Sequence, residues 1–343
     1  MPVHNFRQPR GRVESMTIAS ETLRGNLLGD PHERTVAVYL PEGYDDGADE
    51  YPLFVGLAGF TGSGLKLLGW QGFGESVPQR ADRLVEQGAM GPVILAFPDC
   101  FTALGGNQYV NSAALGRWED FLLDEMIPAI ESRFRVRRDA PSRAVFGRSS
   151  GGYGALIQAL LHADRWGGVA CHSADINFDL CYRPDLAKAV DELARHGGDI
   201  TRFIEHLRSV DKIAGSEMYA LMLLAMAATY DPDPDAPFGV RLPVDPHTCQ
   251  LIDERWQRWL GLDPLRMIER QECQDNLRRL PALFIDCGSK DQYGLHYGAR
   301  ALVRRLKDLG IDHHYEEFDD NHSGIDYRMD RSLPFLYEAV SRV

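Results

Sequence analysis

Residues 143–156 read RAVFGRSSGGYGAL, and their pattern is the strongest indication of the fold in this chain. An apolar run leads into GRSSG at 147–151, and a helix-forming run follows it. A serine between a strand and a helix stands on a tight, strained turn that lifts its hydroxyl clear of the strand. Side chains two residues to either side would collide there, so Gly147 and Gly151 fit the turn. We therefore expect Ser149 to be a nucleophile and not an ordinary capping serine. The alternative, Ser150, does not have glycine at both positions two residues away.

The flanking sequence alternates between short apolar runs and helical periodicity. We expect strands at 34–40, 53–57, 93–97, 144–146, 282–287 and 314–318, and helices at 118–134, 150–163, 295–309 and the C-terminus. Pro128 should bend or weaken the first of these helices. Strands that alternate with helices predict a mostly parallel sheet with helices on both faces. With the GRSSG turn, this predicts the α/β-hydrolase fold.

The alternation stops between about residues 175 and 276, where the sequence is mainly helical. We interpret 176–276 as a helical insertion, or cap, within a single domain that spans residues 1–343. Its apolar stretch, with Met218, Leu221, Met222, Leu224 and Met226, could line an acyl pocket because methionine adapts to varied shapes. Packing onto the main domain is the interpretation we favour.

A nucleophilic serine needs a base, and the base needs a carboxylate that fixes its tautomer. In this fold the order along the chain is serine, acid, histidine. Asp291 lies on the loop just past the strand at 282–287, whereas Asp286 lies inside that strand. We therefore choose Asp291 as the acid; the alternative role for it is a helix N-cap.

The base is expected at the carboxyl end of the last strand, where the site residues of open α/β sheets gather. His322 stands in a polar turn after the strand at 314–318. His313 and His314 begin that strand at the wrong edge, and His296 lies on a helix. His322 is therefore the predicted base.

The oxyanion formed during acyl transfer needs two backbone N–H donors. The glycine-rich loop at 56–64, GLAGFTGSG, offers the N–H of Phe60, and the residue after the nucleophile, Ser150, offers the second. Neighbouring residues are candidates for the pocket wall: Ala58, Gly59, Thr61, Arg148, His172 and Asp175.

Four segments together resemble the esterase D family of α/β-hydrolases, which includes S-formylglutathione hydrolases, feruloyl esterases and mycolyltransferases. They are LAGFTG at 57–62, GRSSGGYGAL at 147–156, IDCGSKDQYG at 285–294 and DNHSG at 320–324. The resemblance implies a triad of Ser149, Asp291 and His322, with Phe60 and Ser150 as backbone oxyanion donors. Ala58 departs from the family's usual His or Ser, as Arg148 and Ser150 depart from its usual His and Met.

Composition narrows the classes of partner. The 343-residue chain has a formal charge of −13, which argues against nucleic acid or an anionic membrane surface as partner.

No run reaches the roughly 18 apolar residues that cross a bilayer, and the N-terminus lacks a signal-peptide core. The six cysteines form no C-x-x-C motif, so we expect free thiols and a cytoplasmic protein. The acidic loop at 231–237 lacks the glycine and glutamate of an EF-hand, so no metal is expected, and no cofactor motif is found.

These features predict a serine carboxylesterase that hydrolyses a small-molecule ester through an acyl-enzyme. Two alternatives stay open: an acyltransferase with the same triad and an alcohol acceptor, and a non-catalytic binding protein on a hydrolase scaffold. The sequence does not identify the acyl and alcohol groups, and it leaves open whether copies of the chain associate into a homo-oligomer.

Overall fold

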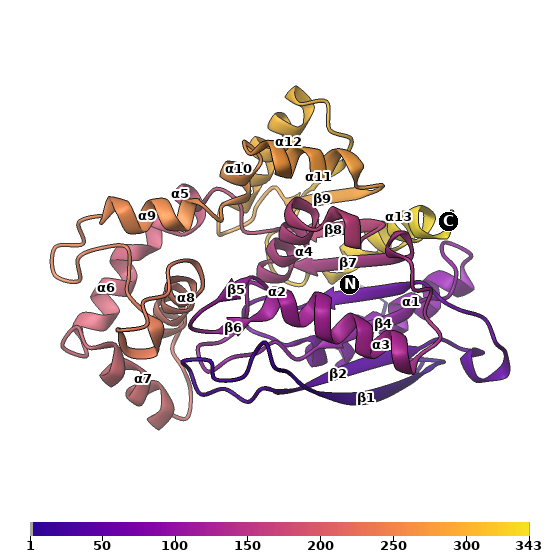
Figure 1. Cartoon of the computed structure of the whole chain (residues 1–343), viewed down its shortest axis with the longest axis horizontal. Coiled ribbons are helices and arrows are strands. Elements are labelled where there is room, and N and C mark those ends of the chain that lie inside the picture. The colour runs from indigo at the N-terminus through magenta and orange to yellow at the C-terminus, as the bar shows by residue number, and fades with distance from the viewer. Residues whose placement is uncertain (1–2, 343) are drawn as a thin grey trace.

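The computed structural model describes residues 3–342 and centres on an eight-stranded sheet (Figure 1). The strand order is β1-β2-β4-β3-β7-β8-β9-β10. β1 and β2 pair antiparallel, as do β2 and β4, and all other neighbours are parallel. The strands are β1 (Arg12–Ala19), β2 (Glu33–Leu40), β3 (Leu53–Leu57), β4 (Ile94–Pro98), β7 (Arg143–Arg148), β8 (Gly168–His172), β9 (Leu283–Gly288) and β10 (His314–Phe318); β5 (Asn111–Ser112) and β6 (Gly116–Arg117) form a separate two-stranded sheet.

Helices cover both faces of the sheet, which confirms the predicted fold class. Helices α1 and α13 pack on one face, and α3, α4 and α12 pack on the other. Their bounds are α1 (Val77–Glu86), α2 (Trp118–Asp120), α3 (Ile127–Arg133), α4 (Ser150–Leu161), α5 (Phe178–Cys181), α6 (Leu186–Ala194), α7 (Ile200–Ser209), α8 (Gly215–Tyr230), α9 (Asp253–Leu260), α10 (Pro264–Met267), α11 (Gln271–Arg279), α12 (Leu295–Asp308) and α13 (Met329–Ser341).

Strand β4 shows why these residues form central strands. Ile94 and Ala96 belong to one apolar core and Leu95 and Phe97 to the other, since successive side chains of a strand point to opposite faces. A continuous apolar run is therefore stable only where helices cover both faces of the sheet.

Strand β1 was not expected from the sequence. It is an edge strand whose side chains are mostly exposed, Met16 being its one buried residue, so it carries no apolar run to detect.

The helix expected at 118–134 forms, but as α2, a π-helical turn (Phe121–Met126) and α3. Pro128 falls in the first turn of α3, where a missing N–H is tolerated.

The chain between β8 and β9 runs through helices α5 to α11. Of these, α6, α7, α8 and α9 lie together at one end of the sheet (Figure 1). That residues 176–276 form a cap within a single domain remains a prediction.

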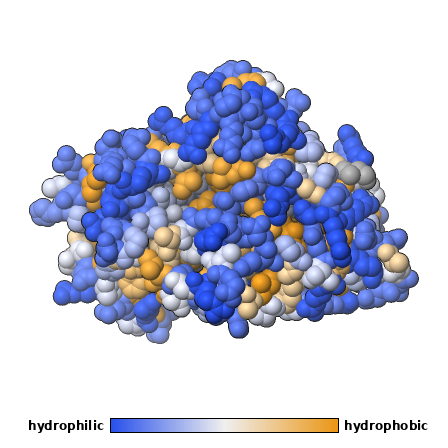
Figure 2. All heavy atoms as spheres, viewed as in Figure 1, coloured by the Kyte–Doolittle hydropathy of each residue, from blue (hydrophilic) through white to orange (hydrophobic). Residues whose placement is uncertain are grey.

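The face of the molecule seen in Figure 2 is largely polar. Figure 2 shows hydrophilic residues over most of the face in view, with hydrophobic ones in the recesses between elements. None of the helices described is both long enough and apolar enough to cross a bilayer.

The topology brings several loops to one edge of the sheet. Strands β3, β7, β8, β9 and β10 run parallel, so their carboxyl ends meet there. After β3 the chain adds β4 on one side and then returns to add β7 on the other. Such a switch point leaves a crevice outside the strand ends, where ligands of open α/β sheets bind.

A buried polar network lies under α13. His172 on β8 pairs through Nδ1 with Asp286 Oδ1 at 2.7 Å and through Nε2 with Ser332 Oγ at 2.9 Å. Arg328 Nε donates to the second oxygen of Asp286 at 2.8 Å. The Asp286 side chain is fully buried, so these partners replace its hydration.

We expect Arg328→Met to lower the free energy of unfolding by about 3 kcal/mol, because it leaves the buried Asp286 carboxylate without its guanidinium. Urea denaturation measures this. Arg342→Met is the matched control, since Arg342 pairs with Glu338 at the exposed end of α13 and should change stability by no more than about 0.5 kcal/mol. Equal effects of the two variants would contradict the stabilising role of Arg328.

Candidate active site

Ser149 occupies a sharp turn between β7 and the helix α4. Its backbone has φ 59° and ψ −126°, a conformation that side-chain-bearing residues rarely adopt. A Cβ on Gly147 would lie 2.2 Å from the carbonyl oxygen of Gly151, and a Cβ on Gly151 would lie 2.1 Å from that of Leu57. Both positions therefore require glycine, for the steric reason inferred from the sequence. The N-terminus of α4, with its partial positive charge, begins directly after Ser149.

Asp291 and His322 form a hydrogen-bonded pair at the same edge of the sheet. Asp291 follows β9 and His322 follows β10, and Asp291 Oδ2 lies 2.7 Å from His322 Nδ1. The backbone N–H of Tyr293 donates to Asp291 Oδ1 at 2.9 Å, and the backbone N–H of His322 donates to Gln292 Oε1 at 3.0 Å. With Nδ1 held by the carboxylate, the other ring nitrogen of His322 is available as a base.

Ser149 and His322 open onto one cavity of about 370 Å³. Phe60 and Ser150 line the same cavity. Among the described residues, neither the Phe60 N–H nor the Ser150 N–H has a hydrogen-bond acceptor. The structure thus brings together all five residues to which the sequence assigned catalytic roles.

The predicted pocket residues divide into two groups. Gly59, Thr61, Arg148 and Asp175 line the cavity. Ala58 and His172 do not. Ala58 is buried, and its carbonyl accepts a hydrogen bond from Tyr109. His172 ends β8, and its side chain lies on the face of the sheet that α13 covers, where it pairs with Asp286 and Ser332.

Several wall residues come from segments whose position the sequence did not reveal. Met218 and Met222 of α8 line the cavity, whereas Leu221, Leu224 and Met226 are buried in the core. The α8 stretch therefore contributes both to the cavity wall and to the core, and an acyl-binding role for its methionines remains a prediction. Further wall residues, for which no signal stood out, are Cys181, Tyr182, Tyr219, Tyr293 and Leu295.

Asp175 is the buried carboxyl of the cavity wall. Its Oδ2 accepts hydrogen bonds from Tyr182 (2.8 Å), Gln108 (3.3 Å) and Ser150 (3.4 Å). Burial raises the pKa of Asp175 above its usual value, while the hydrogen bond from Tyr182 and the charge of His322 act against that rise. Asp175 therefore lies within the electrostatic reach of the predicted base.

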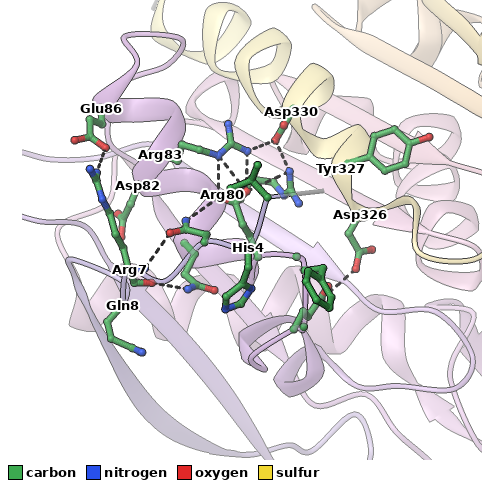
Figure 3. Close-up of a pocket in the computed structure, with 18 of the residues that line it drawn as sticks. His4, Arg7, Gln8, Arg80, Asp82, Arg83, Glu86, Asp326, Tyr327 and Asp330 are labelled. Carbon is green, nitrogen blue, oxygen red and sulfur yellow. Dashed lines mark hydrogen bonds and ion pairs between the residues drawn. The ribbon is translucent and has the colours of Figure 1, made fainter. Parts of the chain in front are cut away.

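A second cavity, of about 810 Å³, lies between the N-terminal segment, α1 and the loop before α13 (Figure 3). Its arginines are already paired within the protein: Arg83 contacts Asp330 and Glu75, both at 2.7 Å, and Arg80 also contacts Asp330. Among the described residues that line it there is no serine or cysteine beside a base, so the smaller cavity is the candidate active site. No cluster of potential metal ligands occurs within residues 3–342.

The sheet and the helices on its faces define an α/β hydrolase, and the comparisons place the chain within this class. A family model described as putative esterase matches residues 30–330, so the chain belongs to that esterase family. An esterase of Mycobacterium tuberculosis is 29% identical over 140 residues, which are 40% of this chain and 28% of that protein. The chain thus matches little more than a quarter of the length of this curated relative.

Solved structures share the fold at low identity. A ferulic acid esterase superposes with a TM-score of 0.61 at 19% identity, covering 97% of this chain and all of the other. An S-formylglutathione hydrolase from Agrobacterium tumefaciens gives 0.55 at 17%, covering 99% of this chain and all of the other. The fluorophosphonate-binding serine hydrolase F of Staphylococcus aureus gives 0.57 at 14%, covering 97% and 98%.

We expect Gly151→Ala to lower the free energy of unfolding by about 1–3 kcal/mol, because the new methyl group would overlap the Leu57 carbonyl and push β3 from α4. Thermal and urea unfolding measure the loss. Gly47→Ala is the control, since its Cβ meets nothing closer than 3.9 Å and its φ is −141°. Wild-type stability of Gly151→Ala would contradict the assigned contact.

Proposed function

We propose that the chain is a serine carboxylesterase that hydrolyses a carboxylic ester through an acyl-enzyme. The observation that carries the proposal is that His322, paired with Asp291 at 2.7 Å, lines the same cavity as the strained Ser149. Membership of the esterase family supports the same reaction class.

In the proposed mechanism Ser149 Oγ attacks the acyl carbon while His322 Nε2 accepts its proton. Asp291 stabilises the resulting imidazolium, and the N–H groups of Phe60 and Ser150 donate to the oxyanion. His322 then protonates the departing alcohol, which leaves an ester on Ser149. Water, deprotonated by His322, attacks that ester and releases the acid and the free serine.

Each member of the triad should be needed for turnover of p-nitrophenyl acetate. Ser149→Ala and His322→Ala should each lower kcat by about 10³-fold or more, and Asp291→Asn by about 10³–10⁴-fold, because the histidine loses its tautomer and orientation. Initial rates at 405 nm are the measurement. Ser132→Ala, His247→Ala and Asp235→Asn change exposed residues of the same types and should keep the wild-type rate. A Ser149→Ala rate equal to wild type would exclude Ser149 as nucleophile.

Diisopropyl fluorophosphate should label the protein once, at Ser149. The serine oxygen displaces fluoride from phosphorus and His322 takes the proton, so the adduct mimics the first half of the reaction. Mass spectrometry of the intact chain and of the peptide that contains 143–156 locates the label. Ser149→Ala should remain unlabelled and Asp291→Asn should react more slowly; a label on Ser150 in the wild type would reassign the nucleophile.

A further inference from the structure

The candidate cavity is lined by one carboxyl group, that of Asp175, which no arginine, lysine or histidine among the described residues contacts. Among the described residues that line it, the charged groups are Arg148 and Asp175, beside the titratable His322. Arg148 Nη1 is paired with Asp326 Oδ1 at 3.1 Å, so its charge is compensated. Asp175 has no ion-pair partner within residues 3–342, because its partners Tyr182, Gln108 and Ser150 are neutral donors.

The geometry of Asp175 leaves one oxygen free. All three donors bind Oδ2, whereas Oδ1 accepts no hydrogen bond from any described residue. The residue is only 7% exposed, and it lines the cavity. The Tyr182 hydroxyl that anchors Oδ2 lies 3.4 Å from the Tyr230 hydroxyl, so the carboxyl is held in place.

The rest of the wall suits a positive charge. Tyr182, Tyr219 and Tyr293 present aromatic rings, and Met218 and Met222 present polarisable thioethers. Burial raises the pKa of Tyr293 to about 12 and that of Tyr182 well above its usual value, so both phenols remain neutral near pH 7. The tyrosines therefore line the cavity with aromatic side chains without adding charge.

We propose that Asp175 is a specificity-determining residue that favours esters with a cationic group in the part that enters the cavity and disfavours esters with a carboxylate there. The inference rests on the proposed esterase function and names a substrate class for it. A cation beside Oδ1 gains attraction that the burial of Asp175 protects from screening, and a carboxylate in the same place meets repulsion. An uncharged group of equal size leaves Oδ1 without a partner, so it binds with intermediate affinity.

The test compares three ethyl esters of similar length that differ in charge: ethyl 3-aminopropanoate, ethyl butanoate and monoethyl succinate. Binding is measured in the Ser149→Ala background, where no ester is consumed, by ligand-observed NMR at pH 8, where a carboxyl with a raised pKa is more fully ionised. We expect the cationic ester to bind about tenfold more tightly than the neutral one, the factor that a hydrogen bond to a charged partner contributes. The anionic ester should bind most weakly.

Asp175→Asn in the same background should bring the ratio of cationic to neutral affinity close to one, because the amide keeps the shape but not the charge. Asp235→Asn removes one negative charge from an exposed loop and should leave the ratio unchanged, which separates the local effect from the net charge of −13. A second pair, acetylcholine and its carbon isostere 3,3-dimethylbutyl acetate, places the charge on the alcohol and reports which half of the ester enters the cavity.

The inference is overturned if neither pair shows a preference for the cation, if the preference survives Asp175→Asn, or if none of the ligands binds. Values of kcat/KM for the same esters with wild-type protein separate this result from the proposed function. If the esters bind with the predicted ranking of affinities but none of them is hydrolysed, the result contradicts the esterase proposal and leaves the charge preference standing. Hydrolysis of all the esters at equal kcat/KM would contradict the charge preference and support the esterase.

Discussion

The contact between the start of α4 and the end of β3 is the constraint on which the site depends. Gly151 lies so close to the Leu57 carbonyl that any Cβ there would overlap it. This approach pins the first turn of α4 against the loop that carries Phe60. The two N–H groups proposed for the oxyanion therefore come from segments about 90 residues apart whose distance is set by backbone packing and not by side chains.

The strained turn is also held from the other side. The Ser149 N–H donates to the His172 carbonyl at 2.9 Å, and the Ser173 N–H donates to the Asp286 carbonyl at 2.8 Å. The side chains of His172 and Asp286 are fixed in turn by Ser332 and Arg328 beneath α13. A backbone conformation that costs about 1–3 kcal/mol persists because neighbouring strands and a helix determine it from several directions.

The sequence predicted the parts of the structure that follow local rules. Strands buried on both faces appear as continuous apolar runs, and Ser149, Asp291 and His322 follow strand ends in an order that the fold requires. Edge strand β1 was missed because its exposure removes the apolar signal. His172 was misplaced because a residue at a strand end can turn to either face, and only its partners Asp286 and Ser332 decide which. Tyr219 and the methionines of α8 could not be assigned because the path of a helical insertion depends on long-range packing.

The network under α13 also bears on how serine hydrolases are recognised by geometry. Ser332, His172 and Asp286 repeat the chemical order and hydrogen-bond spacing of a catalytic triad within the same chain, yet each of the three is at most 1% exposed. Arg328 occupies the acid's second oxygen, and no substrate can reach the hydroxyl. Interatomic distances alone would therefore not distinguish this arrangement from a catalytic triad. What separates the proposed nucleophile Ser149 from the structural hydroxyl of Ser332 is its place on a cavity, beside the Phe60 and Ser150 amides.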